Sequence, residues 1–277
     1  MPRFANKVAI ITGSSNGIGR ETAILFAREG AKVTITGRKA ANLQETKELM
    51  IKSGGKEENI LALTGDLRHE DVQKLLISST VEKFGGIDIL VNNAGGSGFD
   101  NSSEQGFKQG METYDYILNL NTRAALVLCR LSLPYLIERK GEIVMVSSIC
   151  GLAQGCPALP YYSMSKAALD QLMRGLAVEY ITKGVRVNSV NPGLITTTFM
   201  QKQGMSESQQ HQRESFLSGD TKRIPAMRPG TSQEIAEAIA FLADRKVSSY
   251  VVGHTLVVDG GCSILNPLLA HYSLESP

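Results

Sequence analysis

The sequence predicts an α/β protein in which helices cover both faces of a doubly wound parallel sheet of about seven strands. Short aliphatic and β-branched runs alternate with amphipathic stretches of helical length along the 277-residue chain. Parallel strands need crossovers of a dozen or more residues, usually helices, and this spacing provides them. Several runs are apolar throughout, as expected for strands covered on both faces.

The order of the elements follows from these patterns. The first strand is expected at residues 7–12, a β-branched run that ends at Gly13, and the first helix at 18–28, which Gly30 ends. The later strand ranges are also rich in Val, Ile and Thr: 32–36, 60–64, 87–92, 142–147, 185–190 and 254–258. The later helix ranges repeat apolar residues at helical spacing: 41–52, 71–84, 112–137, 161–182 and 232–242. Neither a linker nor a repeat divides the chain, so residues 1–277 are expected to form one domain.

Composition and charge exclude several classes of protein. Lys and Arg number 29 and Asp and Glu 27, a net charge of +2 without a basic cluster, which argues against nucleic-acid binding. Residues 143–165 carry no charge, but Pro157 and Pro160 make them a poor membrane helix, so no membrane association is expected. The four cysteines lack metal-ligand spacing, so we expect no metal site and reduced thiols in a cytoplasmic protein. The N-terminal residues show no apolar signal segment.

Two segments depart from the alternation. Residues 194–228 mix polar residues with Phe199, Met200, Met205, Phe216 and Met227. Long irregular segments in compact domains are often lids, so we expect this one to close over an apolar substrate, the alternative being a surface insertion. The tail at residues 264–277 either reaches a neighbouring subunit's site or is disordered.

A glycine-rich loop joins the first strand to the first helix. Its glycines are Gly13, Gly17 and Gly19, with Ser15, Asn16 and Ile18 between them. Glycines at this junction allow a tight turn and let backbone N–H groups approach a pyrophosphate at the helix N-terminus. The loop therefore predicts a dinucleotide-binding site. No G-K-[ST] sequence follows, which excludes a P-loop NTPase.

The end of the second strand bears on the choice of dinucleotide. This position reaches the adenosine ribose, where an acidic residue would bind the 2′-hydroxyl of NAD(H). The sequence has Arg38 and Lys39 there instead, which would attract a 2′-phosphate. We therefore expect NADP(H) rather than NAD(H). The alternative is a solvated basic turn.

A tyrosine and a lysine share a face of the helix at 161–182. Tyr162 and Lys166 are four residues apart, about 40° around a helix, whereas Tyr161 lies about 140° from Lys166. The pKa of a Tyr side chain is ordinarily about 10, and a nearby ammonium group favours the phenolate. The pair therefore predicts acid–base chemistry at Tyr162.

Further polar motifs follow the fourth, fifth and sixth strands. The fourth strand ends in Asn92-Asn93-Ala94-Gly95, the fifth in Ser147-Ser148 and the sixth in Asn191-Pro192-Gly193. Two further asparagines, Asn119 and Asn121, lie within the helix at 112–137. Together with the glycine loop and the Tyr162–Lys166 pair, their order resembles that of the short-chain dehydrogenase/reductase family. The resemblance covers roughly residues 7–261 and implies a Rossmann-type fold.

This resemblance implies roles for four residues. Tyr162 would be the general acid/base, and Lys166 would lower its pKa and hold the nicotinamide ribose. Ser148 would polarise the substrate carbonyl, and is preferred to Ser147 because Gly151 follows it by three residues. Asn121, rather than Asn119, would hold a proton-relay water.

The resemblance also implies cofactor contacts and subunit assembly. Besides the glycine loop, Arg38, Tyr162 and Lys166, the expected cofactor-binding residues are Asp66, Leu67, Asn93, Ala94, Gly95, Pro192, Gly193, Ile195 and Thr197. Family members that use NADP(H) often carry a basic residue where this chain has Asn16, so the NADP(H) prediction depends on Arg38. The family is commonly tetrameric, and a homo-oligomer, tetramer or dimer, is expected.

These residues predict an NADP(H)-dependent oxidoreductase. It would transfer a hydride between the cofactor and a carbonyl or secondary alcohol of a small, apolar or alicyclic molecule. Sugars and acyl-thioesters stay open as substrates, because fold and motif do not decide the substrate. The alternative function is a catalytically silent dinucleotide-binding regulator or scaffold of the same fold.

Overall fold

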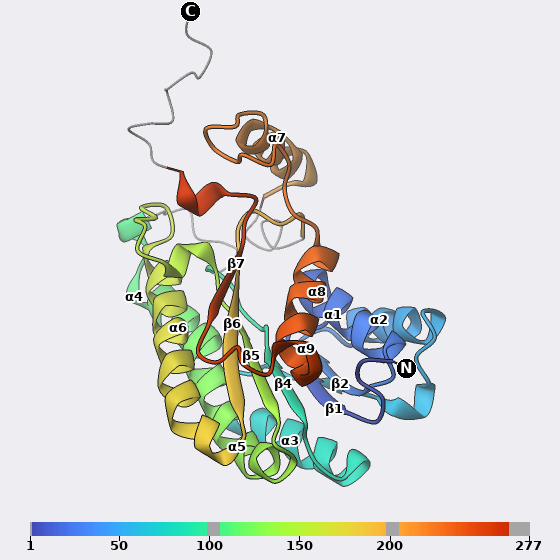
Figure 1. The fold of residues 1–277 in the computed structure, drawn as a ribbon. Coiled ribbons are helices and arrows are strands. Elements are labelled where there is room, and N and C mark those ends of the chain that lie inside the picture. The colour runs from blue at the N-terminus through green and yellow to red at the C-terminus, as the bar shows by residue number, and fades with distance from the viewer. Residues whose placement is uncertain (1, 99–105, 198–204, 266–277) are drawn as a thin grey trace, which may run out of the picture.

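The fold is a seven-stranded parallel sheet with helices on both faces (Figure 1). The computed structural model describes residues 2–98, 106–197 and 205–265. The strands are β1 (Val8–Ile11), β2 (Lys32–Gly37), β3 (Ile60–Thr64), β4 (Ile89–Asn92), β5 (Glu142–Val146), β6 (Arg186–Pro192) and β7 (Thr255–Val258). Their order across the sheet is β3-β2-β1-β4-β5-β6-β7, and every neighbouring pair is parallel. The predicted fold class is confirmed.

The helices form one layer on each side of this sheet. They are α1 (Gly17–Arg28), α2 (Ala40–Lys52), α3 (Glu70–Phe84), α4 (Met111–Leu118), α5 (Ala124–Arg139), α6 (Pro160–Tyr180), α7 (Glu207–Ser218), α8 (Ser232–Ala243) and α9 (Arg245–Ser248). Helices α1, α2 and α8 lie on one face, and α3, α5 and α6 on the other (Figure 1). None of the helices in the described ranges is long and apolar enough to cross a bilayer.

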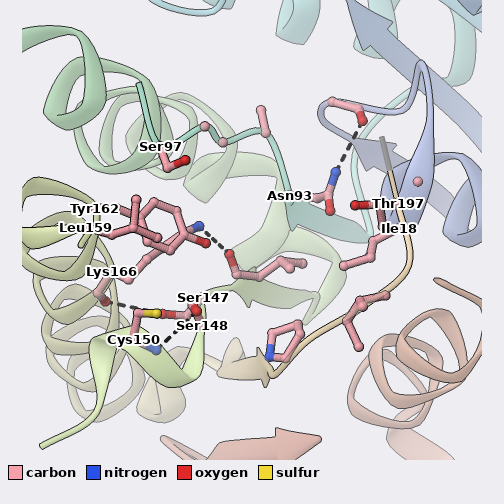
Figure 2. Close-up of a pocket in the computed structure, with 18 of the residues that line it drawn as sticks. Ile18, Asn93, Ser97, Ser147, Ser148, Cys150, Leu159, Tyr162, Lys166 and Thr197 are labelled. Carbon is pink, nitrogen blue, oxygen red and sulfur yellow. Dashed lines mark hydrogen bonds between the residues drawn. The ribbon is translucent and has the colours of Figure 1, made fainter. Parts of the chain in front are cut away.

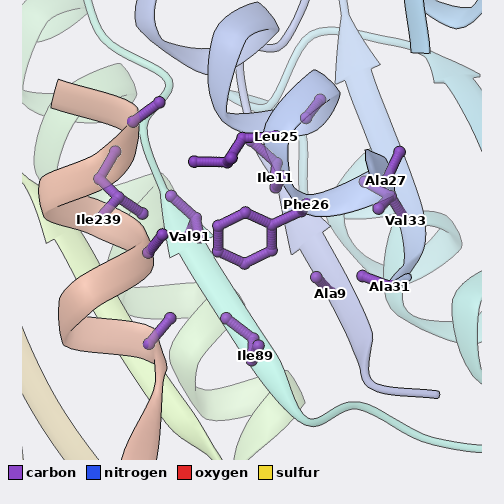
Figure 3. Close-up of a cluster of buried hydrophobic side chains, with 14 of the residues drawn as sticks. Ala9, Ile11, Leu25, Phe26, Ala27, Ala31, Val33, Ile89, Val91 and Ile239 are labelled. Atoms are coloured by element: carbon purple, nitrogen blue, oxygen red, sulfur yellow. The ribbon is translucent and has the colours of Figure 1, made fainter. Parts of the chain in front are cut away.

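Two hydrophobic cores hold the layers together. Along β1, Ala9 and Ile11 point to one core and Ile10 to the other, as the alternation of side chains in a strand requires. In the first core Phe26 of α1 packs between the sheet and Ile239 of α8 (Figure 3). Burial on both faces explains why these strands are apolar throughout.

The strand order reverses beside β1, which pairs with both β2 and β4. Chain crossovers therefore leave in opposite directions at this point, and a crevice forms outside the carboxyl ends of the strands. The loops after β1, β2, β4, β5 and β6 all reach this edge of the sheet.

The segment expected to be an irregular lid contains a helix, α7. Ser206 and Gln209 form a capping box at its start, which stabilises the helix although most of its residues are polar. Phe216 and Met227 are exposed, so neither side chain is enclosed in this structure, and closure of the segment over an apolar substrate stays a prediction. Phe199 and Met200 lie outside the described residues, as does the tail from residue 266 onward.

The long helix expected at 112–137 extends from Met111 to Arg139, but it is not uniform. Its centre, Asn119–Arg123, is a π-helical segment between α4 and α5. Such segments are rare and are found frequently at functional sites. Asn121 lies within this one.

Candidate active site

A cavity of about 520 Å³ extends along the carboxyl ends of the strands. It is lined by nearly all the residues that the sequence predicted for the site: Gly13, Ser15, Asn16, Gly17, Ile18, Arg38, Asp66, Leu67, Asn93, Ala94, Gly95, Ser148, Tyr162, Lys166, Pro192, Gly193, Ile195 and Thr197. Gly19 and Asn121 are buried and do not line it. Residues far apart in sequence therefore converge on one elongated space.

The glycine loop forms one wall of the cavity. Gly13 and Gly17 have φ values of +65° and +55°, a region that favours glycine. A Cβ at Gly13 would lie 2.8 Å from the Cα of Ala94, and one at Gly19 would lie 2.5 Å from the Asn93 side chain. The loop and the turn after β4 therefore pack closely, and α1 begins directly behind them without an acidic residue in its first turn. This arrangement fits a pyrophosphate.

The far end of the cavity is basic. Arg38, directly after β2, donates a hydrogen bond to the Tyr116 hydroxyl at 3.1 Å. The guanidinium carbon of Arg68 lies 4.5 Å from the centre of the Tyr116 ring, and Arg68 binds the carboxylate of Asp66. This ion pair holds the pKa of Asp66 below its usual value. The hydrogen bond to Tyr116 thus holds Arg38 at this end of the cavity.

Tyr162, Lys166 and Ser148 meet at the opposite end (Figure 2). Tyr162 and Lys166 project from the first turns of α6, and Ser148 follows β5. The hydroxyls of Ser148 and Tyr162 are hydrogen-bonded to each other. The amine of Lys166 donates to the carbonyl of Val146 at 2.8 Å and lies 5.6 Å from the centre of the Tyr162 ring.

Burial shifts the pKa values of Tyr162 and Lys166. It raises the pKa of Tyr162 above its usual value, which the hydrogen bond from Ser148 offsets only in part. It also lowers the pKa of Lys166 to about 8. Desolvation of the phenolate and the neighbouring Cys150 raise the pKa of Tyr162 in this structure, and a lowering of that pKa by Lys166 stays a prediction. The Tyr162 hydroxyl is therefore expected to keep its proton at neutral pH.

The two serines after β5 that could face a substrate, Ser147 and Ser148, have different surroundings. The Ser147 hydroxyl points away from Tyr162 and donates to the carbonyl of Lys166 at 3.2 Å. Ser148 accepts a hydrogen bond from the amide of Cys150 at 3.1 Å, and its own carbonyl accepts one from Asn191. Asn191 also donates to Asp170 at 2.8 Å. The geometry therefore favours Ser148 as the serine that can reach a substrate.

Asn121 supports the site from behind the cavity wall. Its side-chain amide donates to the Gly96 carbonyl and to the Ser165 hydroxyl, both at 2.9 Å, and its carbonyl oxygen accepts from the Gly96 amide. Asn119 is exposed. Asn121 thus fixes the loop after β4 against α6, and the proton-relay water at this residue stays a prediction.

Sequence reasoning missed several residues that belong to the site. Tyr116 holds Arg38, and Arg213 and Leu217 of α7 line the cavity mouth. Asp170 links α6 to β6 behind Ser148, because it accepts a hydrogen bond from Asn191, a residue that sequence reasoning named only as part of a motif. The four-residue spacing of Lys166 and Asp170 on one helix face could have indicated that Asp170 belongs to the site. The position of Tyr116, in contrast, depends on how α4 packs. Cys150, Cys156 and Cys262 also line the cavity.

Comparison with known proteins gives matches over nearly the whole chain. The family model described as "Enoyl-(Acyl carrier protein) reductase" matches residues 13–263. Glucose 1-dehydrogenase from Gluconobacter oxydans is 39% identical over 266 residues, which are 95% of this chain and 94% of that protein.

Two solved structures from Caenorhabditis elegans also match. One is a short-chain dehydrogenase/reductase of unknown function with cofactor, 45% identical with a TM-score of 0.95, covering 98% of this chain and 100% of that chain. The other is glucose dehydrogenase in the apo form, 48% identical with a TM-score of 0.82, covering 95% of this chain and 99% of that chain. The glycine loop, the converging Ser148, Tyr162 and Lys166 and these extended likenesses show that the chain belongs to the short-chain dehydrogenase/reductase family of oxidoreductases.

Proposed function

We propose that the protein is an NADP(H)-dependent oxidoreductase that interconverts a carbonyl group and a secondary alcohol of a small molecule. One observation carries this proposal. Ser148, Tyr162 and Lys166 converge at one end of a cavity whose other end holds Arg38, with the glycine loop between them. A dinucleotide bound along this cavity, with its adenosine end at Arg38, would have its reactive ring beside Tyr162.

The protein's own residues supply proton transfer and orientation. A bound nicotinamide dinucleotide supplies hydride-transfer chemistry. In the direction of reduction, the Tyr162 hydroxyl gives its proton to the substrate oxygen, and its raised pKa keeps that proton in place at neutral pH. The Ser148 hydroxyl donates a hydrogen bond to the same oxygen as negative charge develops on it. Lys166 would hold the nicotinamide ribose.

The preference for NADP(H) is assigned to Arg38. Its guanidinium carries a positive charge at the end of β2, where an acidic residue would repel a 2′-phosphate. The Ser15 side chain lies beside Gly37, so a hydroxyl is also available near the same point. The bond to Tyr116 holds Arg38 at the cavity.

An apolar or alicyclic substrate is supported by the side chains near Tyr162. Leu159 lies beside Tyr162 (Figure 2), and Leu217 and Ile224 also line the cavity. A sugar is the second candidate, because two similar proteins are named glucose dehydrogenases and because Arg213 and Ser97 add polar groups to the lining.

The proposal includes a homo-oligomer, tetramer or dimer, in the cytoplasm. Large apolar side chains are exposed on the outer helices and near the sheet edge, including Val178, Phe241, Val247 and Tyr250. Strand β7 is the outermost strand of the sheet and is only half-buried. Such surfaces are commonly covered by another subunit. The cytoplasmic assignment follows from reduced cysteines.

Substitution of Tyr162 tests the mechanism directly. Because Tyr162→Phe removes the proton donor, kcat for ketone reduction at saturating NADPH should fall by about 10²- to 10⁴-fold while NADPH still binds. The matched control is Tyr161→Phe. The Tyr161 hydroxyl donates to the Gln109 carbonyl at 2.9 Å outside the cavity, so its loss should leave kcat nearly unchanged.

Two outcomes would contradict the proposal. One is a Tyr162→Phe variant that keeps most of the wild-type rate. The other is a wild-type protein that binds NADPH tightly but reduces none of a broad panel of ketones and sugars, which would favour the silent regulator.

A further inference from the structure

Three of the four cysteines lie around the substrate end of the cavity. Cys150 follows β5 in the 3₁₀ turn Ile149–Gly151, Cys156 lies in the loop before α6, and Cys262 lies after β7. The sulfur atoms of Cys150 and Cys156 are 3.9 Å apart. Cys129 is buried in the core, where its Sγ accepts a hydrogen bond from the Asn92 side chain.

The geometry allows Cys150 and Cys156 to be joined. A disulfide bond is about 2.05 Å long, so the two sulfur atoms would have to approach by roughly 2 Å. Space for this movement exists in the loop that carries Cys156, because residues 153–155 are exposed and a side chain at Gly155 would meet no atom within 4 Å. The loop is tied to the segment after β7 by one hydrogen bond, from the Gln154 side chain to the Ser263 carbonyl at 2.6 Å. The intervening loop is only five residues long, so bringing its ends together costs little chain entropy.

Cys150, in contrast, is fixed to the catalytic residues. Its backbone amide donates to the Ser148 hydroxyl at 3.1 Å. A Cβ at the next residue, Gly151, would lie 2.8 Å from the backbone of Lys166, so the turn is packed directly on α6. A new bond at Cys150 would therefore pull on Ser148 and narrow the space beside Tyr162.

We propose that Cys150 and Cys156 are a modification site at which a hydroperoxide forms a reversible disulfide across the substrate end of the cavity, which inactivates the enzyme. The loss of activity rests on the proposed function, whereas formation of the bond does not. Cytoplasmic dithiol reductants would reverse it, as is usual for disulfides in that compartment.

The reaction is balanced in two steps. The thiolate of one cysteine attacks an oxygen of hydrogen peroxide, the O–O bond breaks, and a sulfenic acid and water form. The thiolate of the other cysteine then attacks this sulfur, the S–O bond breaks, and the disulfide and a second water form. The two thiols lose two electrons and two protons in total, and the peroxide gains them. Burial and the neighbouring Cys156 raise the pKa of Cys150 to about 11, so oxidation at neutral pH should be slow.

Mass spectrometry of the oxidised full-length protein tests the proposal. The protein is incubated with hydrogen peroxide, quenched with catalase, alkylated and digested with trypsin. Both cysteines fall in the single tryptic peptide 141–166, since no Lys or Arg lies between Gly141 and Lys166. We expect this peptide to become lighter by two hydrogen atoms and resistant to alkylation.

Activity should follow the disulfide. A misplacement of about 1 Å near the reacting groups can lower a rate about a hundredfold, so a loss of that order is expected, with recovery in dithiothreitol. Cys156→Ser should keep its own activity under the same peroxide treatment. Cys262→Ser should still form the disulfide, which separates this pair from the third thiol.

Three results would overturn the proposal. The peptide could remain fully alkylated, Cys156→Ser could be inactivated as fast as wild type, or dithiothreitol could fail to restore activity, as irreversible overoxidation would cause. Because the disulfide is scored by mass, a failure of the proposed reductase activity would be recognised separately.

Discussion

Lys166 is the buried amine on which the site's electrostatics depend. It is 3% exposed, and burial lowers its pKa from 10.5 to about 8. Asp170, one helical turn later, favours the charged form but does not balance the burial. The folded protein therefore binds a proton at this site less readily than the unfolded chain does.

This difference predicts a pH dependence of stability. Between about pH 8 and 10.5 the unfolded chain keeps the Lys166 proton that the folded protein has lost, so the free energy of unfolding should rise with pH in this window. Outside the window the two states bind equally many protons at Lys166 and the contribution is constant. Relative to Lys166→Met, wild type should gain up to about 1.4 kcal/mol per pH unit, measured by urea unfolding of the cofactor-free protein. A difference between the two proteins that does not change with pH would contradict the lowered pKa.

At the scale of elements, the loop between β1 and α1 is constrained by close backbone contacts. Gly13 has a positive φ, and a Cβ at this position would lie 2.8 Å from the Ala94 backbone. Because the clash is with backbone, a change of side-chain rotamer could not relieve it. The same loop would surround the pyrophosphate. We therefore expect stability and cofactor binding to depend on the same residue, Gly13.

Gly13→Ala should damage both properties. We expect a loss of about 1–3 kcal/mol in unfolding free energy, as for other overpacked sites, and weaker NADPH binding by fluorescence titration. Gly155→Ala is the matched control, because its Cβ would meet nothing within 4 Å and should change neither quantity. Wild-type NADPH affinity in Gly13→Ala would show that the loop does not approach the cofactor.

Helix α7 shows where a sequence pattern was insufficient. Its residues are mostly polar, so no apolar periodicity marks it, although the Ser206–Gln209 capping box was a local signal. Gln210 donates to the Thr197 carbonyl and Thr196 donates to Glu214, which attach the helix to the loop after β6. These long-range bonds, which position Arg213 and Leu217, cannot be predicted from spacing.

For the molecule as a whole, the sequence predicted the parallel sheet, and the structure brings most of the predicted site residues together in one cavity. Alternating strands and helices determine a parallel sheet, and the carboxyl ends of parallel strands share one edge, so motifs that follow strands must meet there. Protonation was not predictable in this way. The raised pKa of Tyr162 depends on burial by segments distant in sequence, and so does the contact between Arg38 and Tyr116.

The most direct test of the account is a fluorescence titration of the purified protein with NADPH and with NADH. A charge-assisted hydrogen bond contributes about 1.5–3 kcal/mol, so NADPH should bind roughly 10- to 100-fold more tightly than NADH. Arg38→Ala should remove this preference. Lys39→Ala should keep it, because Lys39 does not line the cavity, whereas Arg38 does. Tighter binding of NADH, a preference that survives in Arg38→Ala, or binding of neither dinucleotide would contradict the account.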